Sequence, residues 1–330
     1  MVKVGWKTKA FIQGTLSRLP KGKFWNQAIQ RRITKSLILD RGKFQTKLGF
    51  AREHLRNLIR FRGDGQGFTV LELGTGRFPI VPLYMFLCGA EQVISLDITR
   101  LLRNDTVRDT LLMYHVHLAE GYLAEARPER VERFREVISA NATPLGIDTL
   151  RQFNIETFVG DARHTALPWH SFDLLVSNTT VEHIPSPTLA GILTHFRDLA
   201  CPGAVMSHFI DMRDHYAEWD RSISVYNFMR YSEQDWRWFN NSLLYQNRLR
   251  VCDYRRIHAE AAWEIVFERA DPGSRREFGT VPLAGEFRGY AERDLLVPTC
   301  WMVSHPCSAA AGEKLTLAAI EKLPKVEIPR

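Results

Sequence analysis

Short apolar runs alternate with amphipathic stretches through most of this chain. Apolar runs of four to eight residues bounded by turn residues are typical of buried strands, whereas apolar residues three or four positions apart are typical of helices. Strands that alternate with helices predict a parallel sheet with helices on both faces, an α/β fold. We expect strands at 68–73, 92–96, 155–159, 173–177 and 204–210, and helices at 80–90, 101–126, 129–140 and 188–199.

The alternation is interrupted at residues 212–255, which are polar and rich in aromatic side chains. We interpret this segment as an inserted lid. Its aromatic residues could stack on a planar or sugar ligand, or pack together as the core of the lid. After the insert we expect a helix at 253–262 and two strands at 263–268 and 295–304, paired as an antiparallel edge.

The first 62 residues are predicted to be helical in pieces. Helical spacing of apolar residues occurs at 24–33 and again at 50–59, with a break at 19–22. We expect the glycine-rich loop at 63–67 to be a domain boundary. We therefore divide the chain into an N-terminal helical cap, residues 1–65, and a main domain, residues 66–330.

Positive charge is concentrated in this leading segment. Residues 1–62 contain 16 of the 44 Lys and Arg residues and two of the 37 acidic residues, a net charge of +14, while the remainder carries −7. Such a segment favours an anionic partner, such as a membrane surface or a phosphate-bearing substrate, or it is simply a solvated helical face. A peripheral membrane contact through residues 1–62 is therefore one expectation.

The remaining composition is that of a globular protein of the cytoplasm. The five cysteines are widely spaced and form no CxxC pair, so neither a zinc site nor a disulfide framework is indicated. We expect no transmembrane helix and no secretory signal, because no apolar run is long enough and no cleavage pattern follows the basic start.

The stretch VLELGTGRFP, residues 70–79, predicts a strand, a tight turn and the start of a helix. Gly74 and Gly76 allow positive φ angles and a close approach to a ligand. A helix that starts after such a turn presents free backbone N–H groups. A Gly-x-Gly turn alone is not specific, so the elements around it have to carry the interpretation.

Polar groups follow five successive predicted strands, at the edge where open parallel sheets bind ligands. Asp97 comes 25 residues after Glu72, at the end of the next strand, where a carboxylate can accept hydrogen bonds from a ribose diol. Asp161 follows the third strand, in position for an adenine amino group. Single acids after strands are common as helix caps, but the joint pattern is less common. Asn178 and Asp211 follow the fourth and fifth strands.

These motifs resemble those of class I S-adenosylmethionine-dependent methyltransferases. VLELGTG, VISLDI and VGDA are similar to the first three motifs of the family, and FDLLVSNTTVEHIPSP is similar to its fourth strand and following turn. The resemblance covers roughly residues 66–305 without the insert. It implies a Rossmann-like sheet of seven strands whose last strand is antiparallel, S-adenosylmethionine as cofactor, and methyl transfer as the reaction.

The resemblance also implies which residues bind the cofactor. Glu72 and the glycine turn would surround the methionine part, Asp97 the ribose, and Asp161 the adenine. The whole implied set is Glu72, Gly74, Thr75, Gly76, Asp97, Ile98, Asp161, Ala162 and Asn178.

One departure from the family pattern is Phe78, which stands where a third glycine is frequent. A dehydrogenase is the competing enzyme class, but its third glycine would fall at Pro79 and it would not require Glu72 or Asp161. A protein that binds the cofactor without catalysis is a further alternative, favoured only by the altered turn.

Deprotonation of an acceptor hydroxyl requires a base, and histidine suits that role because its ordinary pKa is near neutral. His183 and His215 are the catalytic candidates. The step Glu182-His183 resembles that of quinone-pathway O-methyltransferases, in some of which it is associated with a divalent metal. Our expectation is no metal, and the residues able to hold one are Glu182, His183, Asp211, Asp214 and His215.

We expect O-methylation of a small hydroxylated acceptor, such as a sugar, a glycan or a secondary metabolite. N- or C-methylation, including that of a lipid or an RNA, is the alternative. Nucleic acid is disfavoured because Ser177-Asn178-Thr179-Thr180 replaces the Asn-Pro-Pro-Tyr step expected for base N-methylation.

Overall fold

The computed structural model describes residues 5–18, 38–140 and 144–307. Within these ranges, seven strands form one sheet in the order β3-β2-β1-β4-β5-β7-β6. Strands β1 to β5 are parallel, whereas β7 is antiparallel to both of its neighbours. The Rossmann-like fold with an antiparallel last strand is therefore confirmed. The strands are β1 (Phe68–Leu73), β2 (Ala90–Asp97), β3 (Ile155–Val159), β4 (Phe172–Asn178), β5 (Ala200–Asp211), β6 (Trp263–Ala270) and β7 (Thr299–Pro306).

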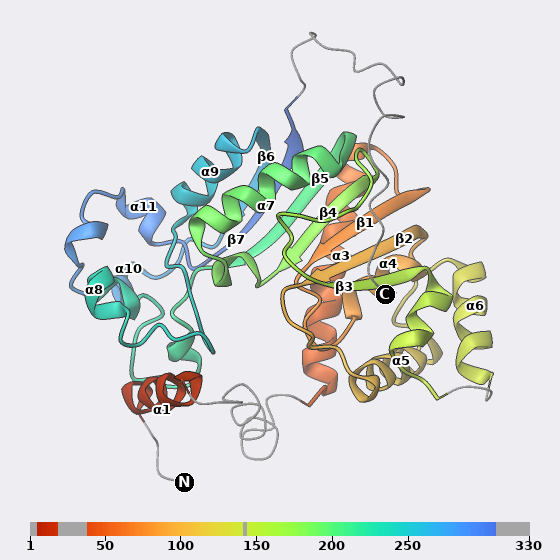
Figure 1. The fold of residues 1–330 in the computed structure, drawn as a ribbon, viewed down its shortest axis with the longest axis horizontal. Helices are drawn as coiled ribbons and strands as arrows, with labels where there is room; N and C mark the ends of the chain where they lie inside the picture. The colour runs from red at the N-terminus through yellow and green to blue at the C-terminus, as the bar shows by residue number, and fades with distance from the viewer. Residues whose placement is uncertain (1–4, 19–37, 141–143, 308–330) are drawn as a thin grey trace.

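Helices cover both faces of the sheet (Figure 1). One face packs against α3, α4, α5 and α6, and the other against α7 and α9. The bounds of these helices are α3 (Arg41–Arg62), α4 (Ile80–Leu87), α5 (Asn104–Ala119), α6 (Pro128–Ser139), α7 (Ser186–Leu199) and α9 (Val251–Glu260). Two short 3-10 helices, η2 (Ile147–Phe153) and η3 (Val181–His183), lie in the connections between them.

The late strand begins four residues later than predicted, at Thr299. The apolar residues before it belong to α11 (Glu292–Leu295) and the turn that follows, where Leu295 is buried in a separate core. Val297 is buried in the core beside α7 and α9, so the apolar pattern of residues 295–298 reflects burial in two cores and not a strand. The expected helix at 101–126 is likewise shorter, because α5 ends before Gly121, whose φ is +74°.

Helix α3 is built into the main core. Asp40 caps its start by accepting a hydrogen bond from the backbone N–H of Lys43 at 2.8 Å, and Gly63 ends it in the left-handed conformation. An apolar face with helical spacing packs on the sheet and on α4; its buried members are Phe44, Leu48, Ala51, Leu55 and Leu58. The basic face of α3 is partly paired, since Arg41 contacts Glu120 and Arg52 contacts Glu125.

Helix α1 (Trp6–Arg18) lies far from α3 and packs on the insert (Figure 1). The insert contains η4 (His215–Glu218), η5 (Asn227–Arg230) and α8 (Glu233–Trp236), and the later α10 (Arg275–Phe278), η6 (Gly285–Phe287) and α11 join it. We call this unit the lid. The lid core has ten buried residues: Trp6, Ala10, Tyr216, Tyr226, Phe228, Met229, Trp236, Val281, Phe287 and Leu295.

Several expectations fall outside the described residues: the helical spacing at 24–33, the break at 19–22 and the tail from Ala309. All five cysteines are free in the structure. In the described part of the chain, no helix combines the length and apolarity needed to cross a bilayer.

Candidate active site

The turn after β1 is formed by Gly74 and Gly76 with φ angles of +87° and +66°. A Cβ atom on Gly74 would lie 2.2 Å from Oγ1 of Thr180, so only glycine fits there. The turn is fixed to β2, because the N–H of Gly74 donates to the carbonyl of Leu96 at 2.7 Å. Phe78, the departure from the family pattern, packs against the main core. The turn at Gly74 and Gly76 therefore forms although Phe78 stands where a third glycine is frequent in the family.

Asp97 links the ends of β1 and β2. Its carboxylate accepts from the backbone N–H of Gly76 at 3.1 Å and from that of Thr99 at 2.9 Å. These bonds lie at the carboxyl edge of the sheet, next to the position where the strand order reverses between β1 and β4. Burial raises the pKa of Asp97, and the two N–H donors oppose that shift.

Glu72 is buried beneath the glycine turn, with 4% of its surface exposed. It accepts a hydrogen bond from the hydroxyl of Ser95, and Thr75 lies 2.5 Å from the same hydroxyl. Burial raises the pKa of Glu72 to about 7. A carboxylate held there has a strong preference for a cationic group.

The end of β3 supplies the remaining expected cofactor residues. Asp161 pairs with Arg163, which holds the pKa of that carboxyl well below its usual range. Ala162 is buried, whereas Ile98, after β2, is 73% exposed. The apolar side chain of Ile98 is thus exposed to solvent next to Asp97.

The loop after β4 connects the glycine turn with the two histidines. Thr179 adopts a positive φ of 45°, and Thr180 contacts Gly74. Asn178 faces the interior, where its Oδ1 lies 3.0 Å from Nε2 of His54, and burial lowers the pKa of His54 to about 3. Thr180, at the turn, and His183 are only three positions apart in the sequence.

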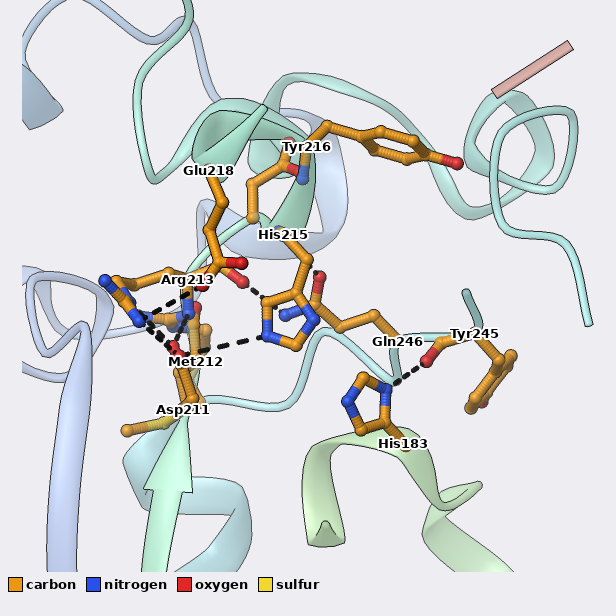
Figure 2. A network of polar contacts seen from close by, with 11 residues as sticks. His183, Asp211, Met212, Arg213, His215, Tyr216, Glu218, Tyr245 and Gln246 are labelled. Carbon is orange, nitrogen blue, oxygen red and sulfur yellow. Dashed lines mark hydrogen bonds and ion pairs between the residues drawn. The ribbon is translucent and has the colours of Figure 1, made fainter. Parts of the chain in front are cut away.

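His183 and His215 face each other with their ring centres 4.9 Å apart (Figure 2). His183 is exposed and comes from η3, and His215 comes from η4, after β5. Nδ1 of His183 lies 2.6 Å from the carbonyl oxygen of Tyr245, so this nitrogen donates and Nε2 carries the lone pair. Burial lowers the pKa of His215 to about 4, so its ring is neutral at physiological pH.

Glu182 completes a group of three. One possible ligand atom each from Glu182, His183 and His215 lies within 4.8 Å of the others. Glu182 is 1% exposed, and neither of its carboxylate oxygens has a hydrogen-bond partner. Burial raises the pKa of this carboxyl well above its ordinary value. The group can therefore act on a proton or hold a cation.

The other two proposed metal ligands are used elsewhere. Asp211 pairs with Arg213 and lies 4.0 Å from Nε2 of His215, at the edge of the group. Asp214 accepts from the backbone N–H of Tyr216 and from the amide of Asn227, both at 2.8 Å. Asp214 is therefore a turn cap, and it does not face His183.

Three consecutive residues of the insert hold the histidine group in place, and Figure 2 shows two of them, Tyr245 and Gln246. Tyr245 orients the ring of His183, and the side chain of Gln246 bonds the backbone of residues 213 and 215. Asn247 donates from its side chain to the carbonyls of Val181 and Ile184 at 2.9 Å. The side-chain amides of Gln246 and Asn247 are thus bound to the protein itself.

A pocket of about 470 Å³ lies between the first turns of α3 and the end of β4. It shares Thr179 with the loop described above, and its charged lining residues are Asp40, Lys43 and Lys47, of which Lys43 pairs with Asp40. Sequence reasoning missed this contribution of α3; the pair of lysines four positions apart beside Phe50 was the available signal. The lining residues are Asp40, Gly42, Lys43, Thr46, Lys47, Phe50 and Thr179.

Most aromatic residues of the insert do not line a site. Trp236 and Tyr216 are 2% exposed and pack with Trp6, whose ring centre is 4.8 Å from that of Phe239. Of the two roles considered for these side chains, a lid core is the one that the structure shows.

No family model matches the sequence, and no curated protein matches it. Among solved structures, the chain is similar to an S-adenosylmethionine-dependent methyltransferase from Methanosarcina mazei, with 12% identity, 73% of this chain and 93% of that chain covered, and a TM-score of 0.41. A Mesorhizobium loti enzyme of the same description has 14% identity, coverage of 78% and 95%, and a TM-score of 0.40.

A third similar structure is the geranyl diphosphate C-methyltransferase of Streptomyces coelicolor, in complex with Mg²⁺, geranyl diphosphate and S-adenosylhomocysteine. Its identity to this chain is 10%, 79% of each chain is covered, and the TM-score is 0.43.

Proposed function

We propose that this protein transfers a methyl group from S-adenosylmethionine to an oxygen of a small hydroxylated acceptor. The observation that carries this proposal is the arrangement of Glu72, the glycine turn and Asp97 at the reversal of strand order. A cofactor there would place its ammonium near Glu72 and its ribose hydroxyls at Asp97. Ile98 and Ala162 would flank the adenine, with Asp161 at its amino group.

Methyl transfer is an in-line displacement at the sulfonium, so the protein has to orient the acceptor and remove its proton. His183 suits the second task because its lone pair on Nε2 is free and its ring is oriented by Tyr245. His215 is neutral and lies against it. Since Thr180 and His183 are only three positions apart, the acceptor oxygen would sit between the glycine turn and these rings.

The pocket beside α3 supports an acceptor that carries a negative group. Lys43 and Lys47 both line it, and it opens next to Thr179. A phosphorylated sugar, a glycan or an acidic secondary metabolite would fit this charge. Helix α1 in addition exposes Phe11 and Ile12, with 74% and 45% of their surfaces accessible, which supports a peripheral membrane contact.

The cofactor is tested by calorimetric titration of the purified protein with S-adenosylmethionine, with NADH as a parallel control. We expect saturable binding of the former alone, followed by transfer of a labelled methyl group in a screen of anionic hydroxylated acceptors. Binding of NADH alone would contradict the proposal. Cofactor binding without turnover on any acceptor would favour a regulatory protein instead.

A further inference from the structure

Helix α3 runs antiparallel to β4 and extends beyond the carboxyl edge of the sheet. Arg62, the last residue of the helix, lies 3.7 Å from Asp173, near the start of β4. His54, eight positions earlier, lies 3.0 Å from Asn178 at the end of that strand. The residues that precede His54 in the helix therefore lie past the strand ends, on the side of the sheet where the glycine turn is. Lys47 is one of them.

A buried chain of hydrogen bonds fixes the helix at this position. Because Oδ1 of Asn178 can only accept, Nε2 of His54 carries the proton, and Nδ1 accepts from the hydroxyl of Ser207 at 2.9 Å. The oxygen of that hydroxyl also accepts from the side-chain amide of Asn57 at 3.0 Å. His54 and Asn57 are both buried, so water does not compete for these bonds. Helix α3 is thus tied to β4 and β5 in one register.

The side chain of Lys47 shares its surroundings with the carboxyl of Glu72. Lys47 lines the pocket beside α3 together with Thr179. The next residue, Thr180, contacts Gly74 in the glycine turn. Burial raises the pKa of Glu72, and the positive charge of Lys47 is among the groups that oppose this rise. Lys47 is exposed, so a ligand can reach its ammonium. One cation and one anion therefore act on the same space beside the glycine turn.

We infer that Lys47 binds the α-carboxylate of the methionine moiety of S-adenosylmethionine, while Glu72 binds its α-ammonium. This inference rests on the proposed function for the identity of the ligand. Its interaction with Glu72 favours the cofactor, and not the acceptor, as the partner of Lys47. Lys43 lies one helical turn further from the strand ends, 3.4 Å from Asp40. A negative group of the acceptor would lie at that outer end of the pocket.

The pair of charges also gives the site a means of selection. The ammonium and the carboxylate of an α-amino acid are bonded to the same carbon, so a cation and an anion held in one space recognise them together. An adenosine compound without the amino-acid group would leave Glu72 and Lys47 without partners. A site whose charged groups are left unpaired by a ligand rejects that ligand.

The test compares two ligands that differ only in the carboxylate. Decarboxylated S-adenosylmethionine keeps the adenosine, the sulfonium and the amine. In calorimetric titration we expect the parent protein to bind S-adenosylmethionine about 10–100-fold more tightly than this analogue, because one charge-assisted hydrogen bond is lost with the analogue. Lys47→Met keeps much of the side-chain length without the charge. It should bind S-adenosylmethionine more weakly by the same factor and the analogue at least as well as the parent does.

Lys43→Met is the matched control, because it removes the same charge from the same pocket four positions earlier. This control and Lys47→Arg should both keep the preference of the parent. Equal loss of affinity for the two ligands in Lys47→Met would indicate a structural role and would overturn the inference. Unchanged binding of both ligands, with a higher KM for an anionic acceptor, would assign Lys47 to the acceptor instead.

Failure of the proposed function gives a different result. If the parent binds neither ligand, the proposed function fails and the inference fails with it. If the parent binds both ligands with the same Kd, the cofactor class stands and the inference alone is contradicted.

Discussion

The hydroxyl of Thr180 occupies the space that a side chain at Gly74 would need, because a Cβ atom on Gly74 would lie 2.2 Å from Oγ1 of Thr180. Gly76 also has a positive φ, but nothing lies within 4 Å of its Cβ position. Gly76→Ala should therefore cost only the backbone strain, about 1–3 kcal/mol. Gly74→Ala should cost more and displace the loop after β4.

Thermal unfolding and the Kd for S-adenosylmethionine of the two variants check this prediction. We expect Gly74→Ala to have the lower unfolding temperature and the higher Kd of the two variants. Equal behaviour of the two variants would mean that Thr180 can move aside at no cost.

Replacement of Asp97 tests the ribose assignment. Asp97→Ala removes a charged acceptor, so we expect the cofactor to bind more weakly by about 2 kcal/mol, roughly 30-fold in Kd. Asp109→Ala, on the exposed face of α5, serves as the control. An unchanged Kd in the Asp97 variant would remove this residue from the cofactor site.

The buried carboxyl of Glu72 makes stability depend on pH. Its pKa rises from 4.5 to about 7 on folding, so the native state holds the proton more tightly than the unfolded chain. Hence the free energy of unfolding falls as pH rises from about 4.5 to about 7 and is level above that range. Glu72→Gln should remove this pH-dependent fall in the free energy of unfolding. The variant should therefore stabilise the cofactor-free protein at pH 8 by up to about 3 kcal/mol.

Urea unfolding at pH 4.5 and at pH 8 measures this effect, with the exposed Glu129→Gln as control. The same Glu72 variant should bind S-adenosylmethionine more weakly, since the counter-charge for its ammonium is lost. A variant that is stabilised at neither pH would show that Glu72 is not desolvated in solution.

His183→Ala and His215→Ala should lower kcat while the Kd for S-adenosylmethionine stays nearly constant. Loss of a general base commonly reduces the rate by about 10²–10⁴-fold. Single-turnover transfer of a labelled methyl group measures this step directly. If neither variant slows transfer, orientation of the acceptor alone drives the reaction.

Trp6 should be essential to the lid. Its ring packs against Tyr216 and Phe239, and the residue is 6% exposed. Trp6→Ala should cost about 3–5 kcal/mol within the lid. Limited proteolysis should then cut residues 212–250 first while the sheet persists. Phe11→Ala on the exposed face of the same helix is the control, and cleavage at the same rate in both variants would contradict the role of Trp6.

The sheet could be predicted from the sequence because its signals are local. Apolar runs mark each strand, and β1 and β3 have the predicted bounds. The turn glycines and the acids at strand ends lie within a few residues of those runs. The histidine group is different, because the ring of His183 is oriented by the carbonyl of Tyr245, 62 positions later. Any residue type can supply a backbone carbonyl, so the sequence does not indicate this contact. The role of the aromatic insert could not be decided from the sequence for a related reason: its packing partner Trp6 lies in α1, more than 200 positions before the insert's core residues Tyr216 and Trp236.

Because α1 packs on the insert, it cannot reach its native position until the insert has been synthesised. The backbone N–H of Trp6 donates to Asp220, 214 positions later, and Leu295 belongs to the same core. At about 5–20 residues per second, a ribosome needs on the order of 10–40 seconds to make that intervening chain. Throughout this time Trp6 and Ala10 have no native surface to cover them. Helix α1 is thus placed only after residues far downstream have been made, and a nascent chain that stalls before the insert leaves Trp6 and Ala10 accessible to chaperones and to aggregation.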